Sequence, residues 1–191
     1  LSGWLERLES QHPTEIDLGL DRVLVVAEAL GVLRSAPKTV TVAGTNGKGS
    51  VVALLTAGLK AMGQVVGTYA SPHLLRFNER ISIDEGEAED AEIVAAFEHI
   101  EAARGDVSLT YFESATLAAL WLFRQRKVDV QVLEVGLGGR LDAVNILDAD
   151  VSVITSIGLD HTDWLGPDRA AISREKAGVA RQNRPCIVAE S

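Results

Sequence analysis

The glycine-rich segment at residues 44–50 constrains the fold of this chain more than any other part of its sequence. A β-branched run, Lys38 to Ala43, precedes it and has the composition of a buried strand. An apolar stretch at residues 50–62 follows it and is typical of a helix. Glycines at such a junction let the backbone turn tightly, so that N–H groups and the positive end of the helix dipole converge. The order of strand, glycine loop and helix therefore predicts a phosphate-binding loop.

The side chains of this loop suit a nucleotide triphosphate bound with magnesium. The Lys48 ammonium group suits the β and γ phosphates, and the Ser50 hydroxyl can face a magnesium ion. The spacing departs from the strict P-loop pattern, because Val42 replaces a glycine and Gly49 separates the lysine from the serine. A glycine turn without a ligand is the alternative, and the flanking elements argue against it. We expect ATP to bind Gly44, Thr45, Asn46, Gly47, Lys48, Gly49 and Ser50.

Strands alternate with helices along the whole chain, which predicts an α/β fold whose sheet is mainly parallel and flanked by helices. The expected strands are residues 38–43, 64–69, 81–83, 128–135, 151–157 and 186–189. The expected helices are residues 4–8, 19–31, 50–62, 90–103, 112–126 and 168–180, with Asp90 as the N-cap of the fourth.

The composition limits the partners of the chain. Its 191 residues, 47% of them hydrophobic, are enough to build one core. A formal net charge of -9 argues against nucleic-acid binding, because phosphates would be repelled. No apolar run approaches the roughly 20 residues that span a bilayer, and Cys186 is the single cysteine, which fits a reducing compartment. We expect a cytoplasmic protein that binds small molecules, and neither nucleic acid nor membrane.

Glu134 is the polar residue whose position is hardest to explain without a cation. It lies in an apolar strand, where a carboxylate is costly unless it is paired or binds a metal ion. A metal ion and the nearby Arg140 are the two alternatives, and we rank the metal first. Two other carboxylates, Glu113 and Asp142, are further candidates, although Glu113 could simply support the start of its helix.

Other candidates follow the expected strands, and ligands bind at the carboxyl ends of strands in parallel sheets. Ser71 follows one strand, and Asp160 and His161 follow another. A capping or turn role is the alternative for His161. From the residues alone, the preferred interpretation of Lys176 is a solvated lysine paired with a neighbour in its helix.

Five motifs, in this order, resemble those of bacterial folylpolyglutamate synthase/dihydrofolate synthase, a family of the Mur ligase superfamily. The resemblance covers essentially the whole chain and implies a P-loop NTPase-like Mur ligase central domain. The motifs are residues 44–50, Ser71-Pro72-His73-Leu74, residues 133–142, residues 160–166 and Glu175-Lys176-Ala177-Gly178.

The resemblance implies an ATP-dependent ligase that joins L-glutamate to dihydropteroate and to folates that already carry glutamate. ATP phosphorylates the pteroate-side carboxylate to an acyl phosphate, the glutamate amine attacks, and phosphate leaves. The implied cofactors are ATP and Mg²⁺, and the implied substrates are dihydropteroate, folates and L-glutamate. The resemblance also implies a monomer for the full-length protein.

The resemblance assigns roles to individual residues. Thr45 to Lys48 hold phosphates, and the magnesium ligands are Ser71, Glu134 and His161. Lys176 matches a lysine that the family carries as a carbamate, so it joins Lys48, Glu134 and His161 as a catalytic residue. The segments matching the pteroate pocket are Ile16, Asp17, Leu18, Thr110, Tyr111, Phe112, Glu113, Leu141, Asp142 and Ala143.

The chain is shorter than the family pattern. We therefore expect residues 1–191 to be the N-terminal ATP-binding domain, without the C-terminal glutamate-ligase domain, and inactive as an isolated fragment. One alternative is a Mur-type ligase of a cell-wall precursor, although the segments near residues 110–113 and 141–145 favour folate. Another is a nucleotide-binding module without catalysis. A switch GTPase is less favoured, because an Asn-Lys-x-Asp stretch is missing.

Overall fold

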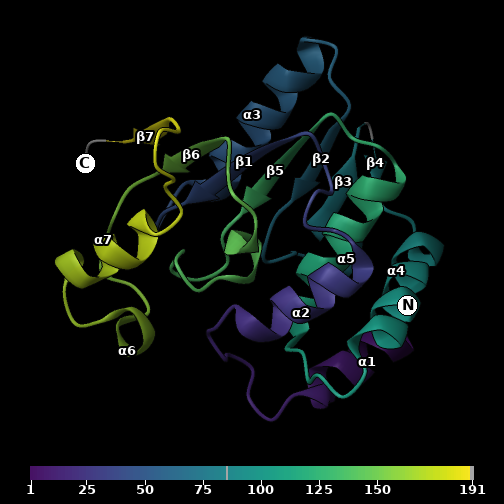
Figure 1. Cartoon of the computed structure of the whole chain (residues 1–191). Helices are drawn as coiled ribbons and strands as arrows, with labels where there is room; N and C mark the ends of the chain where they lie inside the picture. Colours follow the sequence, from purple (N-terminus) through teal and green to yellow (C-terminus); the bar gives the residue numbers. More distant parts are fainter. Residues whose placement is uncertain (85, 190–191) are drawn as a thin grey trace.

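A computed structural model describes residues 1–84 and 86–189, in which seven strands form one sheet (Figure 1). The strands are β1 (Lys38–Ala43), β2 (Val66–Tyr69), β3 (Ile81–Ile83), β4 (Gly86–Glu87), β5 (Val130–Glu134), β6 (Val151–Ile154) and β7 (Cys186–Val188). The helices are α1 (Ser2–Gln11), α2 (Asp21–Leu30), α3 (Lys48–Ala61), α4 (Asp90–Arg104), α5 (Tyr111–Gln125), α6 (Thr162–Leu165) and α7 (Arg169–Ala177), with 3-10 turns η1 (Phe77–Arg80) and η2 (Ala143–Ile146).

The sheet is mainly parallel, as the sequence predicts. Its strand order is β4-β3-β2-β5-β1-β6-β7. The five strands from β2 to β7 in this order pair in parallel, and β3 and β4 add an antiparallel hairpin at one edge. The register aligns Val42 of β1 with Glu134 of β5 and Val153 of β6. The carboxyl ends of the parallel strands therefore meet at one edge of the sheet, where the phosphate loop begins.

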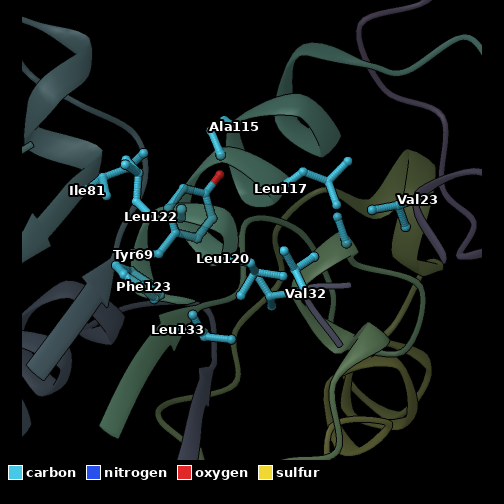
Figure 2. Packing of buried hydrophobic residues seen from close by; sticks show 14 of the residues in the cluster. Val23, Val32, Tyr69, Ile81, Ala115, Leu117, Leu120, Leu122, Phe123 and Leu133 are labelled. Atoms are coloured by element: carbon cyan, nitrogen blue, oxygen red, sulfur yellow. The ribbon is translucent and has the colours of Figure 1, made fainter. Parts of the chain in front are cut away.

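The two faces of the sheet are covered unequally. Helices α1, α2, α4 and α5 form the larger hydrophobic cluster on one face, and Figure 2 shows its side chains, with Tyr69 and Phe123 next to Leu133. Helix α3 contacts β1, β2 and β5 from the other face, where a smaller cluster includes Val52 and Val132. Figure 1 shows α3 apart from the group of α1, α2, α4 and α5. The larger cluster fixes α5, whose first residues belong to one of the predicted substrate segments.

Several element boundaries differ from those predicted. Glu89, not Asp90, is the N-cap of α4. Its backbone N–H donates to the carboxylate of Glu92, three residues later, in a capping box. Strand β6 ends at Ile154, and the polar residues after it form a loop instead of extending the strand. Strand β4 and helix α6 were not predicted, since two and four residues are too short to show a period. Among the described residues, every helix is too short or too polar to cross a bilayer.

Gly67 of β2 is a sensitive test of this packing. A Cβ atom there would lie 2.5 Å from the buried ring of Phe123, so we expect Gly67→Ala to lower the free energy of unfolding by about 1–3 kcal/mol. Denaturant unfolding measures the change. Gly58→Ala is the matched control, because its Cβ atom meets no heavy atom within 4 Å and alanine favours a helix interior. Equal stability of the two variants would contradict the packing of β2 against α5.

Candidate nucleotide and metal site

The phosphate loop connects β1 to α3 at the carboxyl edge of the sheet. Gly47 is the N-cap of α3 and has a φ of 86°, a left-handed value that favours glycine. Gly44 has no room for a side chain, because a Cβ atom would lie 1.7 Å from the Thr155 hydroxyl oxygen. Helix α3 begins at Lys48, and the first N–H groups of a helix have no acceptor within it. The loop and the helix end thus offer the anion site that the sequence predicts.

The segment at residues 155–158 braces the phosphate loop, and the sequence analysis did not identify it. The Thr45 N–H donates to the Ser156 carbonyl oxygen at 2.7 Å, and the Asn46 N–H donates to the Ser156 hydroxyl at 3.3 Å. The Gly158 N–H in turn donates to the Thr45 hydroxyl at 3.0 Å. In this structure the amides of Thr45 and Asn46 therefore hold the loop in shape.

Two lysines converge on the carbonyl oxygen of Gly44. Lys48 donates to it at 3.1 Å, and Lys176 of α7 donates to it at 2.9 Å. Lys176 is only 4% exposed, and burial, reinforced by the positive charge of Lys48, lowers its pKa to about 8. The interpretation of Lys176 as a solvated, paired lysine is therefore wrong. The helix brings this amine into the phosphate loop from the far end of the chain.

Glu134 ends β5 beside the same loop and is 5% exposed. The Ser71 N–H donates to its Oε2 at 3.3 Å, and a Cβ atom on Gly49 would lie 3.9 Å from that oxygen. Burial raises the pKa of Glu134, while the Ser71 amide and the Lys48 charge oppose the rise. The predicted alternative of pairing with Arg140 is wrong, since Arg140 pairs with Glu175 at 3.0 Å. Glu134 is thus a buried carboxylate with one long amide contact, which fits a bound cation.

His161 is placed less tightly than the other predicted metal ligands. It is the N-cap of α6, with a φ of 49°, and its side chain is 51% exposed. Its Nε2 atom lies 3.7 Å from the Asp160 carboxylate. Within residues 1–84 and 86–189, no three His, Cys, Asp or Glu side chains form one metal-binding group. The structure therefore brings Ser71 and Glu134 together, and the third ligand stays a prediction.

The first two predicted substrate segments are tied together by Arg22. Its guanidinium group lies 2.7 Å from the Asp17 carboxylate and 3.2 Å from that of Glu113. Glu113 also accepts from the Thr110 N–H at 2.7 Å in a capping box, so it supports the start of α5 as the alternative interpretation proposed. Ile16 and Leu18 flank Asp17 and are half-buried. Arg22 therefore holds residues 16–18 close to residues 110–113, which form the start of α5.

Asp142 organises the third predicted substrate segment, between Leu141 and Ala143. Its carboxylate accepts from the N–H groups of Gly136 and Leu137 at 3.0 and 2.9 Å. Burial raises the pKa of Asp142 to about 6, and these hydrogen bonds limit the rise. A Cβ atom on Gly136 would lie 2.6 Å from the ring of Phe112. Gly136 therefore lies between Phe112 and Asp142, and Asp142 makes its hydrogen bonds within its own loop.

Asn145 has a structural role that its sequence context does not indicate. Its side-chain amide donates to the carbonyl oxygens of Arg140 and Gly178, at 3.0 and 3.1 Å. The backbones of Gly139 and α7 touch, because a Cβ atom on Gly139 would lie 2.9 Å from the Glu175 carbonyl oxygen. This close contact places the helix that carries Lys176. The run of two glycines before Arg140 was the available signal.

A family model described as the Mur ligase middle domain matches residues 42–186. The chain belongs to the Mur ligase family. One family relative, the dihydrofolate synthase/folylpolyglutamate synthase of Escherichia coli (strain K12), is 59% identical over 190 residues, which cover 100% of this chain and 45% of the relative. The α/β fold of the family, with its loop, strands and flanking helices, is the one that the sequence predicts.

Solved structures are equally similar. The E. coli FolC in complex with DHPP and ADP is 59% identical, with a TM-score of 0.97, and the match covers 98% of this chain and 45% of that one. A bifunctional folylpolyglutamate synthase/dihydrofolate synthase with Mn, AMPPNP and L-glutamate bound is 59% identical, with a TM-score of 0.92, over 98% of this chain and 45% of that one. The chain therefore spans less than half the length of these relatives.

The bracing of the phosphate loop can be tested through Ser156. We expect Ser156→Ala to weaken binding of Mg-ADP about tenfold, because the loop loses hydrogen bonds that each contribute about 1 kcal/mol. Isothermal titration calorimetry measures the affinity. Ser173→Ala is the matched control, since the Ser173 hydroxyl bonds only to a backbone carbonyl, that of Arg169 in α7, among the described contacts. Unchanged affinity in Ser156→Ala would show that the loop keeps its shape without this brace.

Proposed function

We propose that this chain is the ATP- and pteroate-binding part of an ATP-dependent ligase. The ligase adds L-glutamate to dihydropteroate and to folates that already carry glutamate, through an acyl phosphate. The observation that carries the proposal is the convergence of Lys48, Ser71 and Glu134 beside a phosphate loop, next to an aromatic segment at Tyr111 and Phe112. Relatives with these names bind ADP, AMPPNP, Mn and L-glutamate, which supports this choice over a cell-wall ligase.

The chain's own groups divide the work of phosphoryl transfer. The first turn of α3 and Lys48 bind the triphosphate, where amides and a fixed cation stabilise charge on the transferring group. Glu134 and Ser71 would hold Mg²⁺, and His161, whose side chain is exposed, would complete its ligands. The bound ion would neutralise the phosphate oxygens. Positioning supplies the rest, since phosphoryl transfer needs little covalent help from a protein.

The substrate side of the site positions the carboxylate that is phosphorylated. Arg22 holds residues 16–18 beside residues 110–113 at the start of α5, and Asp142 orders the loop that carries residues 141–143. Fixed spacing turns the meeting of carboxylate and ATP into an intramolecular event, which can supply several kcal/mol of the barrier. We propose that glutamate is bound by residues outside this chain, in keeping with relatives more than twice its length. A nucleotide-binding module without catalysis is the outcome if those residues are missing.

We also propose that Lys176 is carried as a carbamate. At a pKa of about 8, about one amine in ten is neutral at pH 7, and the neutral amine is the form that attacks carbon dioxide. The nitrogen forms a bond to carbon and releases a proton, which leaves an anion in place of a cation. Lys48 lies close enough to lower the pKa of Lys176, so its charge would favour the anionic product.

The carbamate can be detected directly. We expect a carbamate carbon signal in NMR spectra of the chain supplied with ¹³C-bicarbonate, and we expect it to grow as the pH rises through 8, because deprotonation supplies the reactive amine. The signal should be absent from Lys176→Arg and retained in Lys60→Arg, which changes a lysine at the end of α3. A spectrum of the unchanged chain without this signal, from pH 7 to 9, would exclude the carbamate.

The proposed activity is tested by glutamate incorporation into dihydropteroate, measured with the product of the complete gene and with this chain. We expect Lys48→Ala to lower turnover by at least about 100-fold, since a fixed donor to the phosphates is lost. Glu134→Gln should raise the required Mg²⁺ concentration about 10- to 100-fold. Lys60→Ala and Glu87→Gln are the surface controls. Incorporation that survives Lys48→Ala and Glu134→Gln unchanged would refute the proposed site.

A further inference from the structure

Arg80 is the half-buried arginine without a carboxylate partner in the part of the chain that the structure describes. Four arginines are half-buried, and in a protein of net charge -9 each would be expected to find an acidic group. Three of them do, as Arg22 pairs with Asp17 and Glu113, Arg104 with Glu101, and Arg181 with Asp148. Partly desolvated cations are normally paired, so the lone one at Arg80 indicates that an anion comes from outside the chain.

The guanidinium group of Arg80 is held in a fixed orientation. Its Nε donates to Nδ1 of His73 at 2.8 Å. Its central carbon lies 5.3 Å from the ring centre of Tyr111 and 5.8 Å from that of Phe77. It also lies close enough to the Tyr69 hydroxyl to lower a pKa that burial raises. Stacking on aromatic rings suits arginine and restricts the group to one plane. Such a group is ready to bind a planar anion without first losing conformational freedom.

Arg80 lies between the proposed metal ligand Ser71 and the predicted substrate segment at Tyr111 and Phe112. Its carbonyl oxygen accepts from the Ala70 N–H at 2.9 Å, so its backbone adjoins the residue before Ser71. Its side chain reaches Tyr111, which neighbours Phe112 in the predicted substrate segment. Phe112 is half-buried like Tyr111, and its ring lies 5.9 Å from the fully buried ring of Tyr69. A substrate stacked on the half-buried rings of Tyr111 and Phe112 and extended toward Ser71 would pass the guanidinium group.

We propose that Arg80 binds the carboxylate of the aromatic acid substrate and orients it toward the phosphate loop. The inference rests on the proposed function and adds a residue to it. A guanidinium group can hold both oxygens of a carboxylate through two parallel hydrogen bonds, which fixes direction as well as position. Lysine would keep the charge but lose this two-point contact. Arg80 thereby matches the anionic end of the substrate, while the aromatic residues match its ring.

The test compares pteroate with its primary carboxamide, which keeps the ring and loses the charge. We measure the affinity of both by calorimetry for the unchanged chain, Arg80→Gln, Arg80→Lys and the surface control Arg126→Gln, each saturated with Mg-ADP. We expect the unchanged chain and the control to prefer the acid by at least about tenfold, as charge-assisted hydrogen bonds require. The preference should fall below about twofold in Arg80→Gln and be intermediate in Arg80→Lys.

Each outcome of this test decides a separate claim. An unchanged preference for the acid in Arg80→Gln would overturn the assignment of Arg80 and leave the proposed function intact. Failure of the unchanged chain to bind either compound would overturn the proposed substrate, and the role of Arg80 with it. Misfolding is monitored by the affinity for Mg-ADP, which should stay the same in all variants because Arg80 has no contact with the phosphate loop among the described residues. Arg80→Lys keeps the positive charge beside His73 and covers the case in which glutamine unfolds the chain.

Discussion

The rest of the site depends on the hydrogen bonds that the carbonyl oxygen of Gly44 accepts. Lys48 and Lys176 both donate to it, so two ammonium groups meet one backbone dipole at the end of β1. Thr155 fills the other side, where any Cβ atom on residue 44 would overlap its hydroxyl. The glycine therefore sets three things at once: the entry of the phosphate loop, the depth of α7, and the path of residues 155–158. A side chain at this position would displace all three.

The sequence predicts the strands well where turn residues bound them. The bounds of β1 and β3 match the prediction, because β1 lies between Pro37 and Gly44 and β3 is a short alternating run. The predicted β5 and β6 are too long for a physical reason. Val135 and the polar residues just after Ile154 have a composition that is compatible with a strand. Their backbone groups bond to β1 and to the phosphate loop at the point where the regular pairing of the strands ends. Composition does not reveal where a ladder stops.

The sequence predicts local parts of the site better than those formed by distant contacts. The phosphate loop, and the approach of Ser71 to Glu134, follow from motif spacing and from the shared edge of a parallel sheet. Lys176 could not be predicted from its charged neighbours, which indicate an exposed helix. Its burial depends on a close approach of backbones at Gly139, more than thirty residues away. Arg80 could not be predicted from the sequence for a similar reason. Its lack of a carboxylate partner among the described residues is recognised only when the partners of the other half-buried arginines are known from the structure.

In the proposed reaction, two anionic substrates, ATP and a carboxylate, must be brought together. An acidic chain repels both, so each needs its own positive partner close to the reacting atoms. In this proposal the helix end and Lys48 bind the triphosphate, and Arg80 binds the carboxylate. Conversion of Lys176 to a carbamate would remove one cation and add one anion, a local change of two charges. The site would then attract a divalent metal beside Glu134 more strongly, and Mg²⁺ would supply positive charge for the phosphate beside Lys48.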